Sequence, residues 1–119
     1  MKKILVVEDD PDLRELLKMR LEANHYEVVL AENGEDGLTK AETEKPDLIM
    51  LDVMMPTLDG YTMSQDLGSN EHLRHIPLIV MTGKQYMEEL FQSGQVKAFF
   101  TKPIDTKEVL KKIKSVLGE

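Results

Sequence analysis

Five short apolar runs recur along the chain, and branched aliphatic residues are frequent in them. Within each run the apolar residues follow one another instead of alternating with polar ones, which is typical of strands buried on both faces of a parallel sheet. The runs cover residues 4–7, 28–31, 48–51, 78–81 and 98–100. We therefore predict five strands of a parallel sheet.

The segments between these runs carry apolar residues at helical spacing. In the last segment, Asp105 can cap a helix and Glu108 stands at the capping-box position, ahead of a single apolar stripe. Asn33 followed by Asp36 gives an earlier helix a similar start. Strands that alternate with helices form βαβ units, so we predict an α/β three-layer sandwich. Its five helices begin at Pro11 and after Asn33, span residues 58–67 and 85–92, and follow Asp105.

The composition narrows the class of protein. The 119 residues are the size of one domain, which we expect to span residues 1–119. The absence of cysteine excludes disulfides, thiolate zinc sites and cysteine nucleophiles. The net charge of -7 argues against a surface for nucleic acid or an anionic membrane. No apolar stretch is as long as a membrane span or a signal peptide, so we expect a cytoplasmic protein.

Polar residues follow four of the five apolar runs. Glu8 and Asp9 follow the first run, Asp52 the third, Thr82 the fourth and Lys102 the fifth. Ligands of open α/β sheets bind outside the carboxyl ends of the strands. We therefore expect three carboxylates, a hydroxyl and an ammonium group to converge at one edge of the sheet.

Such a cluster favours phosphoryl-transfer chemistry. Three carboxylates in one pocket repel one another and need a counter-charge. Oxygen ligands suit Mg²⁺ or Mn²⁺ better than zinc. A cation and an ammonium can neutralise phosphoryl oxygens while a carboxylate oxygen attacks phosphorus. Each residue alone is better explained as an ordinary strand end or helix cap, as Asp9 and Asp10 illustrate, and it is their combination that favours a site.

Five motifs occur in order along essentially the whole chain. They are ILVVEDDP at residues 4–11, LDVMMP at 51–56, LDG at 58–60, MTG at 81–83 and TKP at 101–103. This ordered set resembles the receiver domains of two-component response regulators. The resemblance implies a flavodoxin-like fold with five parallel strands in the order 2-1-3-4-5. The segment between Thr82 and Lys102 is shorter than in most members of that family.

The resemblance also implies a role for each residue at the sheet edge. Asp52 would be the phosphorylated aspartate. Glu8 and Asp9, together with Asp52 and the backbone carbonyl of Met54, would bind Mg²⁺, with Mn²⁺ as a possible substitute.

Three further residues would respond to the phosphoryl group. Thr82 would bind a phosphoryl oxygen and act as the switch hydroxyl, and Phe99 would be the rotating switch aromatic. Lys102 would pair with the phosphoryl group, and its peptide bond to Pro103 is expected to be cis.

The implied function is to accept a phosphoryl group from a sensor histidine kinase or a phosphotransfer protein. The signal would pass to a downstream protein target or a fused output domain, without direct contact with nucleic acid or membrane. Such a domain is a signalling module that catalyses its own phosphorylation and dephosphorylation, not an enzyme in the ordinary sense. Two alternatives remain open: a flavodoxin-like FMN-binding module, and a Mg²⁺-dependent phosphatase with an aspartyl-phosphate intermediate. The acidic pocket disfavours the first, and Met54, at a position where those phosphatases carry aspartate, disfavours the second.

Overall fold

The computed structural model describes residues 1–52, 60–83 and 94–119 of the chain. The described residues form one parallel sheet with the strand order β2-β1-β3-β4-β5, so the predicted order is confirmed. All four neighbouring strand pairs are parallel. The strands are Lys3–Val7 (β1), Glu27–Ala31 (β2), Leu48–Asp52 (β3), Leu78–Thr82 (β4) and Val96–Thr101 (β5).

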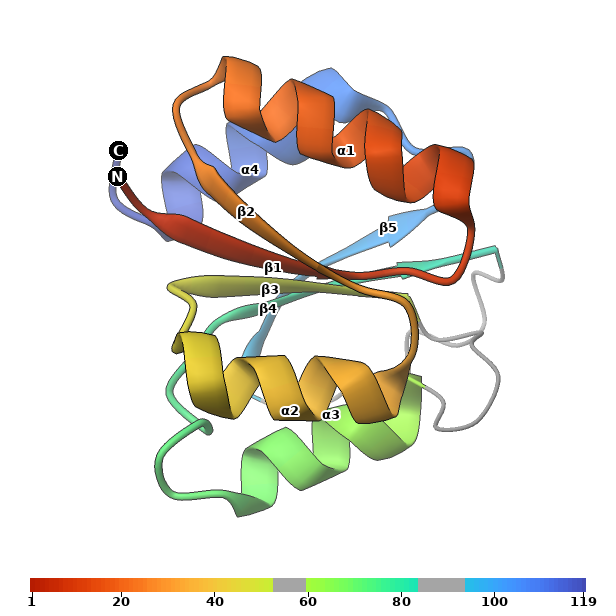
Figure 1. Cartoon of the computed structure of the whole chain (residues 1–119). Coiled ribbons are helices and arrows are strands. Elements are labelled where there is room, and N and C mark those ends of the chain that lie inside the picture. The colour runs from red at the N-terminus through yellow and green to blue at the C-terminus, as the bar shows by residue number, and fades with distance from the viewer. Residues whose placement is uncertain (53–59, 84–93) are drawn as a thin grey trace.

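Helices cover both faces of this sheet. They are Pro11–Ala23 (α1), Gly34–Glu44 (α2), Gly60–Ser69 (α3) and Thr106–Val116 (α4). Helices α1 and α4 lie on one face, and α2 and α3 lie on the other (Figure 1). The described residues thus contain four helices where the sequence predicted five, because the helix expected over residues 85–92 lies outside the described residues.

Two hydrophobic layers hold the helices to the sheet. In the interior strand β1, Ile4 and Val6 face one layer, while Leu5 and Val7 face the other. This alternation explains the unbroken apolar run, since a strand covered on both faces needs apolar residues at every position. Strands β3 and β4 are buried throughout. The central strands therefore form a rigid base for the residues at their carboxyl ends.

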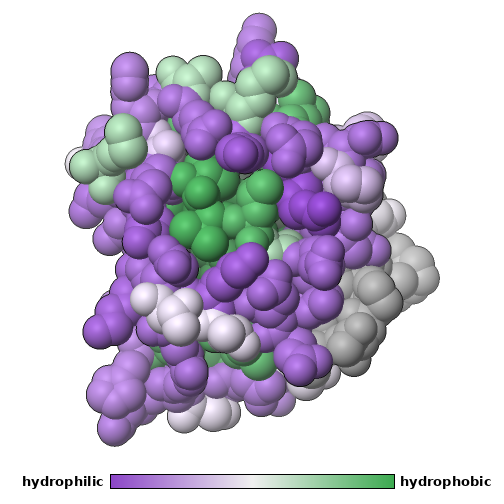
Figure 2. All heavy atoms as spheres, in the orientation of Figure 1, coloured by the Kyte–Doolittle hydropathy of each residue, from purple (hydrophilic) through white to green (hydrophobic). Residues whose placement is uncertain are grey.

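Strand β2 lies at the edge of the sheet, and its side chains are less covered. Val28, Val29 and Leu30 are only half-buried. Figure 2 shows a hydrophobic area in the middle of this face of the molecule, where Figure 1 places β2 between α1 and α2. Among the described residues, no helix combines the length and apolarity needed to cross a membrane.

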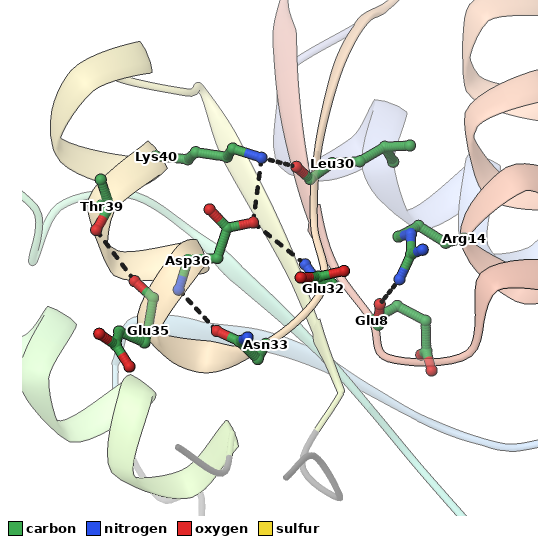
Figure 3. Close-up of polar contacts among 9 residues, drawn as sticks. All are labelled: Glu8, Arg14, Leu30, Glu32, Asn33, Glu35, Asp36, Thr39 and Lys40. Atoms are coloured by element: carbon green, nitrogen blue, oxygen red, sulfur yellow. Dashed lines mark hydrogen bonds and ion pairs between the residues drawn. The ribbon is translucent and has the colours of Figure 1, made fainter. Parts of the chain in front are cut away.

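The predicted helix starts are largely confirmed. The Asp105 carboxylate accepts hydrogen bonds from the amides of Lys107 and Glu108 at the start of α4. At the start of α2, the Asn33 side chain accepts a hydrogen bond from the Asp36 amide at 2.8 Å (Figure 3). In a standard capping box, the side chain three residues into the helix accepts a hydrogen bond from the amide of the N-cap residue. Here the Asp36 carboxylate instead accepts a hydrogen bond from the amide of Glu32 at 3.4 Å.

Candidate functional site

The residues predicted to form the site lie together at the carboxyl edge of the sheet. Glu8 and Asp9 follow β1, Asp52 ends β3, Thr82 ends β4 and Lys102 follows β5. These four strands are adjacent in the sheet, so their ends meet. The Lys102 amide donates a hydrogen bond to the Thr82 carbonyl at 2.6 Å, which continues the pairing of β4 and β5 to this point.

Three carboxylates form the centre of this edge. One oxygen each from Glu8, Asp9 and Asp52 lie within 4.8 Å of one another. Glu8 and Asp52 are buried, whereas Asp9 is exposed. The neighbouring Asp10 has a different task, because its carboxylate accepts a hydrogen bond from the Asp12 amide and caps α1. Asp10 therefore caps α1, whereas Asp9 belongs to the carboxylate cluster. The sequence alone left both roles open.

Lys102 provides the counter-charge for the two buried carboxylates. Its ammonium donates a hydrogen bond to Asp52 Oδ2 at 3.0 Å and another to Glu8 Oε1 at 3.1 Å. Burial alone would lower the pKa of Lys102, but the hydrogen bonds to Glu8 and Asp52, together with their electrostatic attraction, outweigh burial and raise it. The lysine therefore stays charged at neutral pH.

The environment of Glu8 shifts its pKa. Burial, followed by repulsion from Asp52, raises the pKa of Glu8 from 4.5 to about 7. Hydrogen bonds from the Asp10 amide and from Lys102 oppose this rise without cancelling it. Near neutral pH, Glu8 is therefore divided between its neutral and its charged form.

The donor atoms fit a divalent cation. Glu8 Oε2 is buried and lies 3.0 Å from the Lys102 ammonium, but no hydrogen-bond donor among the described residues is aligned with it. A buried oxygen without such a partner costs free energy that a metal ion would recover. Clustered carboxylate oxygens are also the ligands that Mg²⁺ prefers. The acidic cluster of Glu8, Asp9 and Asp52 is thus suited to a divalent cation such as Mg²⁺.

Removing the Glu8 charge should alter the pH dependence of stability. Between pH 4.5 and 7, folded Glu8 keeps a proton that unfolded Glu8 has released, so the free energy of unfolding falls as pH rises through this window. Glu8→Gln lacks this loss. Without divalent cations, the free energy of unfolding of Glu8→Gln relative to that of the parent should therefore rise by about 3 kcal/mol across this pH window.

Urea unfolding at pH 5 and pH 8 measures this difference. Glu15→Gln, which changes an exposed glutamate of α1, provides the baseline. A difference between Glu8→Gln and the parent that is the same at both pH values would contradict the raised pKa.

Thr82 and Phe99 lie on the same face of the sheet. Thr82 is buried at the end of β4. Val80 lies two residues earlier in the same strand and pairs with Phe99 of β5. Phe99 and Tyr61 both pack against Val80. Phe99 is only half-buried. Its role as a rotating aromatic stays a prediction.

Two further predictions concern the neighbouring backbone. The peptide bond between Lys102 and Pro103 is cis, as expected. Met54, whose carbonyl was expected to bind the metal, lies outside the described residues.

The backbone around Glu8 is held from several sides. The Glu8 amide donates to the Ala31 carbonyl at 3.0 Å, and the Asp10 amide donates to Glu8 Oε1. The Arg14 guanidinium donates to the Glu8 carbonyl at 2.8 Å (Figure 3). Arg14 was not among the predicted site residues. Its sequence signal is weak: a single arginine one turn into the helix that follows the acidic pair.

The fold and the site together define a phosphoryl-accepting signalling domain of the flavodoxin-like type. The chain belongs to the response regulator receiver domain family, whose model matches residues 4–114. This membership favours phosphoacceptance over the FMN-binding and phosphatase alternatives. The chain is thus a receiver domain of a two-component response regulator.

Relatives of this family match nearly the whole chain. It is 40% identical over 118 residues to the alkaline phosphatase synthesis transcriptional regulatory protein PhoP of Bacillus subtilis, covering 98% of the chain but 48% of PhoP. The chain thus spans about half the length of that relative. It is 36% identical over 120 residues to the protein PilH of Pseudomonas aeruginosa, covering 99% of each.

A solved structure shares the fold. The response regulator TrrA of Thermotoga maritima, crystallised in complex with Mg²⁺-BeF, matches with a TM-score of 0.88 and 32% identity. The match covers 98% of this chain and 99% of that chain.

Proposed function

We propose that Asp52 accepts a phosphoryl group from a phosphohistidine of a sensor histidine kinase or a phosphotransfer protein. The observation that carries this proposal is the position of the Asp52 carboxylate. It lies in the acidic cluster and 3.0 Å from the Lys102 ammonium. Glu8 is a poorer nucleophile because its pKa of about 7 leaves it partly protonated near neutral pH. Asp9 is exposed at the rim of the cluster.

In the proposed reaction, an oxygen of Asp52 attacks phosphorus as the P–N bond of the donor breaks. The bonding electron pair goes to the imidazole nitrogen of the donor, and the phosphoryl group becomes an acyl phosphate on Asp52. Lys102 holds an oxygen of Asp52 in place and provides positive charge for the phosphoryl oxygens. Thr82, at the end of the adjacent strand, donates its hydroxyl to a phosphoryl oxygen.

A divalent cation completes the proposed site. Mg²⁺, or Mn²⁺ in its place, would be held by Glu8, Asp9, Asp52 and the Met54 carbonyl, the last of which lies outside the described residues. When bound, the cation supplies charge that offsets the repulsion between the carboxylates and the incoming phosphoryl group. The protein would thereby catalyse its own phosphorylation and dephosphorylation.

Residues 1–119 would act as a single signalling domain of the cytoplasm. Its output would be read by a separate protein or by an output domain fused to it. The net charge of -7 makes direct binding of this domain to nucleic acid unfavourable. The same net charge does not disfavour binding to other proteins.

Metal binding by the acidic pair tests the proposed site. Asp9→Asn should weaken Mg²⁺ binding by about tenfold or more, because a neutral amide replaces a charged ligand. The metal-free variant should be no less stable than the parent, because one repelling charge is gone. NMR titration with Mg²⁺ measures the affinity, and Asp12→Asn, an exposed acid in the first turn of α1, is the control. Unchanged affinity in Asp9→Asn would place the cation elsewhere.

We further propose that the signal passes from Thr82 to Phe99. The Thr82 hydroxyl gains a charged acceptor when Asp52 is phosphorylated, and its turn toward that acceptor frees space on the face that Phe99 shares. A hydrogen bond to a charged group contributes about 1.5–3 kcal/mol, whereas a nearly complete switch needs about 5.5 kcal/mol. Lys102 must therefore contribute as well.

Thr82→Ala should accept the phosphoryl group and yet switch only partly. NMR shifts of Phe99 on phosphorylation should be smaller in this variant than in the parent. Thr101→Ala, at the position paired with Thr82 in β5, is the matched control. Shifts of full size in Thr82→Ala would show that the signal leaves the site by another route.

A further inference from the structure

Arg14 connects helix α1 to the backbone of the acidic pair. It lies in the first turns of α1, is half-buried, and donates from its guanidinium to the Glu8 carbonyl at 2.8 Å (Figure 3). That carbonyl belongs to the peptide group that joins Glu8 to Asp9. A peptide group is planar, so an anchor on its oxygen fixes the plane from which both residues extend.

We infer that Arg14 is a positioning residue for the divalent-cation site. It acts through the Glu8–Asp9 peptide and holds the two carboxylates in the arrangement that binds the ion. This inference rests on the proposed function, because it assumes that the acidic cluster binds Mg²⁺.

Two other hydrogen bonds hold this segment, but neither involves the peptide group between Glu8 and Asp9. The Glu8 amide is paired with the Ala31 carbonyl, which fixes the chain before Glu8. The Asp10 amide binds Glu8 Oε1, which fixes a side chain. The Arg14 contact is the one among these three that holds the peptide between the two acids. A donor with a full charge also makes a stronger hydrogen bond than a neutral one.

The charge of Arg14 and its positioning role predict opposite changes in Mg²⁺ affinity when Arg14 is replaced, so the direction of the change tests the inference. A positive charge near a cation site opposes cation binding, so its removal alone should tighten Mg²⁺ binding. Loss of positioning should weaken binding instead. Residues that orient metal ligands typically contribute ten- to a hundredfold to metal affinity, which exceeds the effect of one partly exposed charge.

The experiment compares Mg²⁺ affinities of folded variants by NMR titration of the backbone amides. Arg14→Met should bind Mg²⁺ about tenfold more weakly than the parent, with a shifted Asp9 amide resonance before any metal is added. Arg14→Lys, which keeps a charged donor, should lie between the two. Arg20→Met removes the same charge from the exposed last turn of α1 and should bind as the parent does.

The unfolding temperature without metal separates positioning from a loss of structure. If Arg14→Met does not fold, Arg14→Gln is measured in its place, and the same tenfold loss is expected. Parental or tighter affinity in the folded neutral variant would overturn the inference and leave the proposed function standing. An absence of Mg²⁺ binding by the parent would overturn both.

Discussion

Asp52→Asn is expected to abolish phosphorylation while leaving the fold intact. The amide has the size of the carboxylate but is not a nucleophile toward phosphorus. Asp52 also lies in the carboxylate cluster at the end of β3, where it accepts a hydrogen bond from Lys102. With acetyl phosphate and Mg²⁺, the parent should gain one phosphoryl group, measured as a mass increase, and the variant none.

Asp10→Asn is the matched control for this experiment. Asp10 lies at the same edge of the sheet, but its carboxylate caps α1, and asparagine caps helices about as well as aspartate. This variant should therefore be labelled as the parent is. Labelling of Asp52→Asn at the parental level would assign the acceptor to another residue.

Lys102→Met is expected to destabilise the metal-free protein by about 3 kcal/mol at pH 8. The substitution leaves Asp52 and Glu8 buried and close together without their counter-charge. Removal of one partner from a buried ion pair typically costs about 3–5 kcal/mol, and the partial exposure of Lys102 reduces that value. The variant should still accept a phosphoryl group slowly, but without the full change around Phe99.

The pH dependence distinguishes this explanation from a simple loss of packing. At pH 5 Glu8 is neutral in the folded protein, because its pKa is about 7, so one of the two repelling charges is absent. The destabilisation by Lys102→Met should therefore be smaller at pH 5 than at pH 8. Lys97→Met, which changes an exposed lysine of β5, serves as the control. Equal destabilisation at both pH values would contradict a role for Lys102 as the counter-charge.

The sheet could be predicted from the sequence because its strands are covered on both faces. The run at residues 48–51 became strand β3 (Leu48–Asp52), with one residue added. The site followed from the same pattern, since polar residues directly after neighbouring strands must meet at one edge. The sequence alone therefore places Glu8, Asp9, Asp52 and Lys102 together.

Contacts that depend on the path of a loop could not be predicted in this way. Asp9 and Asp10 are adjacent and chemically identical, and only the backbone geometry assigns one to the cluster and the other to the α1 cap. The Asp36 carboxylate binds the amide of Glu32 because of the turn before α2. Arg14 contacts the site through a backbone carbonyl, which every residue type has, so the sequence does not indicate this contact.

Trapping the acyl phosphate in the unmodified protein tests the central claim most directly. After incubation with acetyl phosphate and Mg²⁺, borohydride reduces an aspartyl phosphate to homoserine, and peptide mass spectrometry locates the changed residue. The account predicts homoserine at position 52 alone, and none when Mg²⁺ is removed by a chelator. Homoserine at position 9 or 10 with Asp52 unchanged would contradict the assignment of Asp52 as the phosphoacceptor.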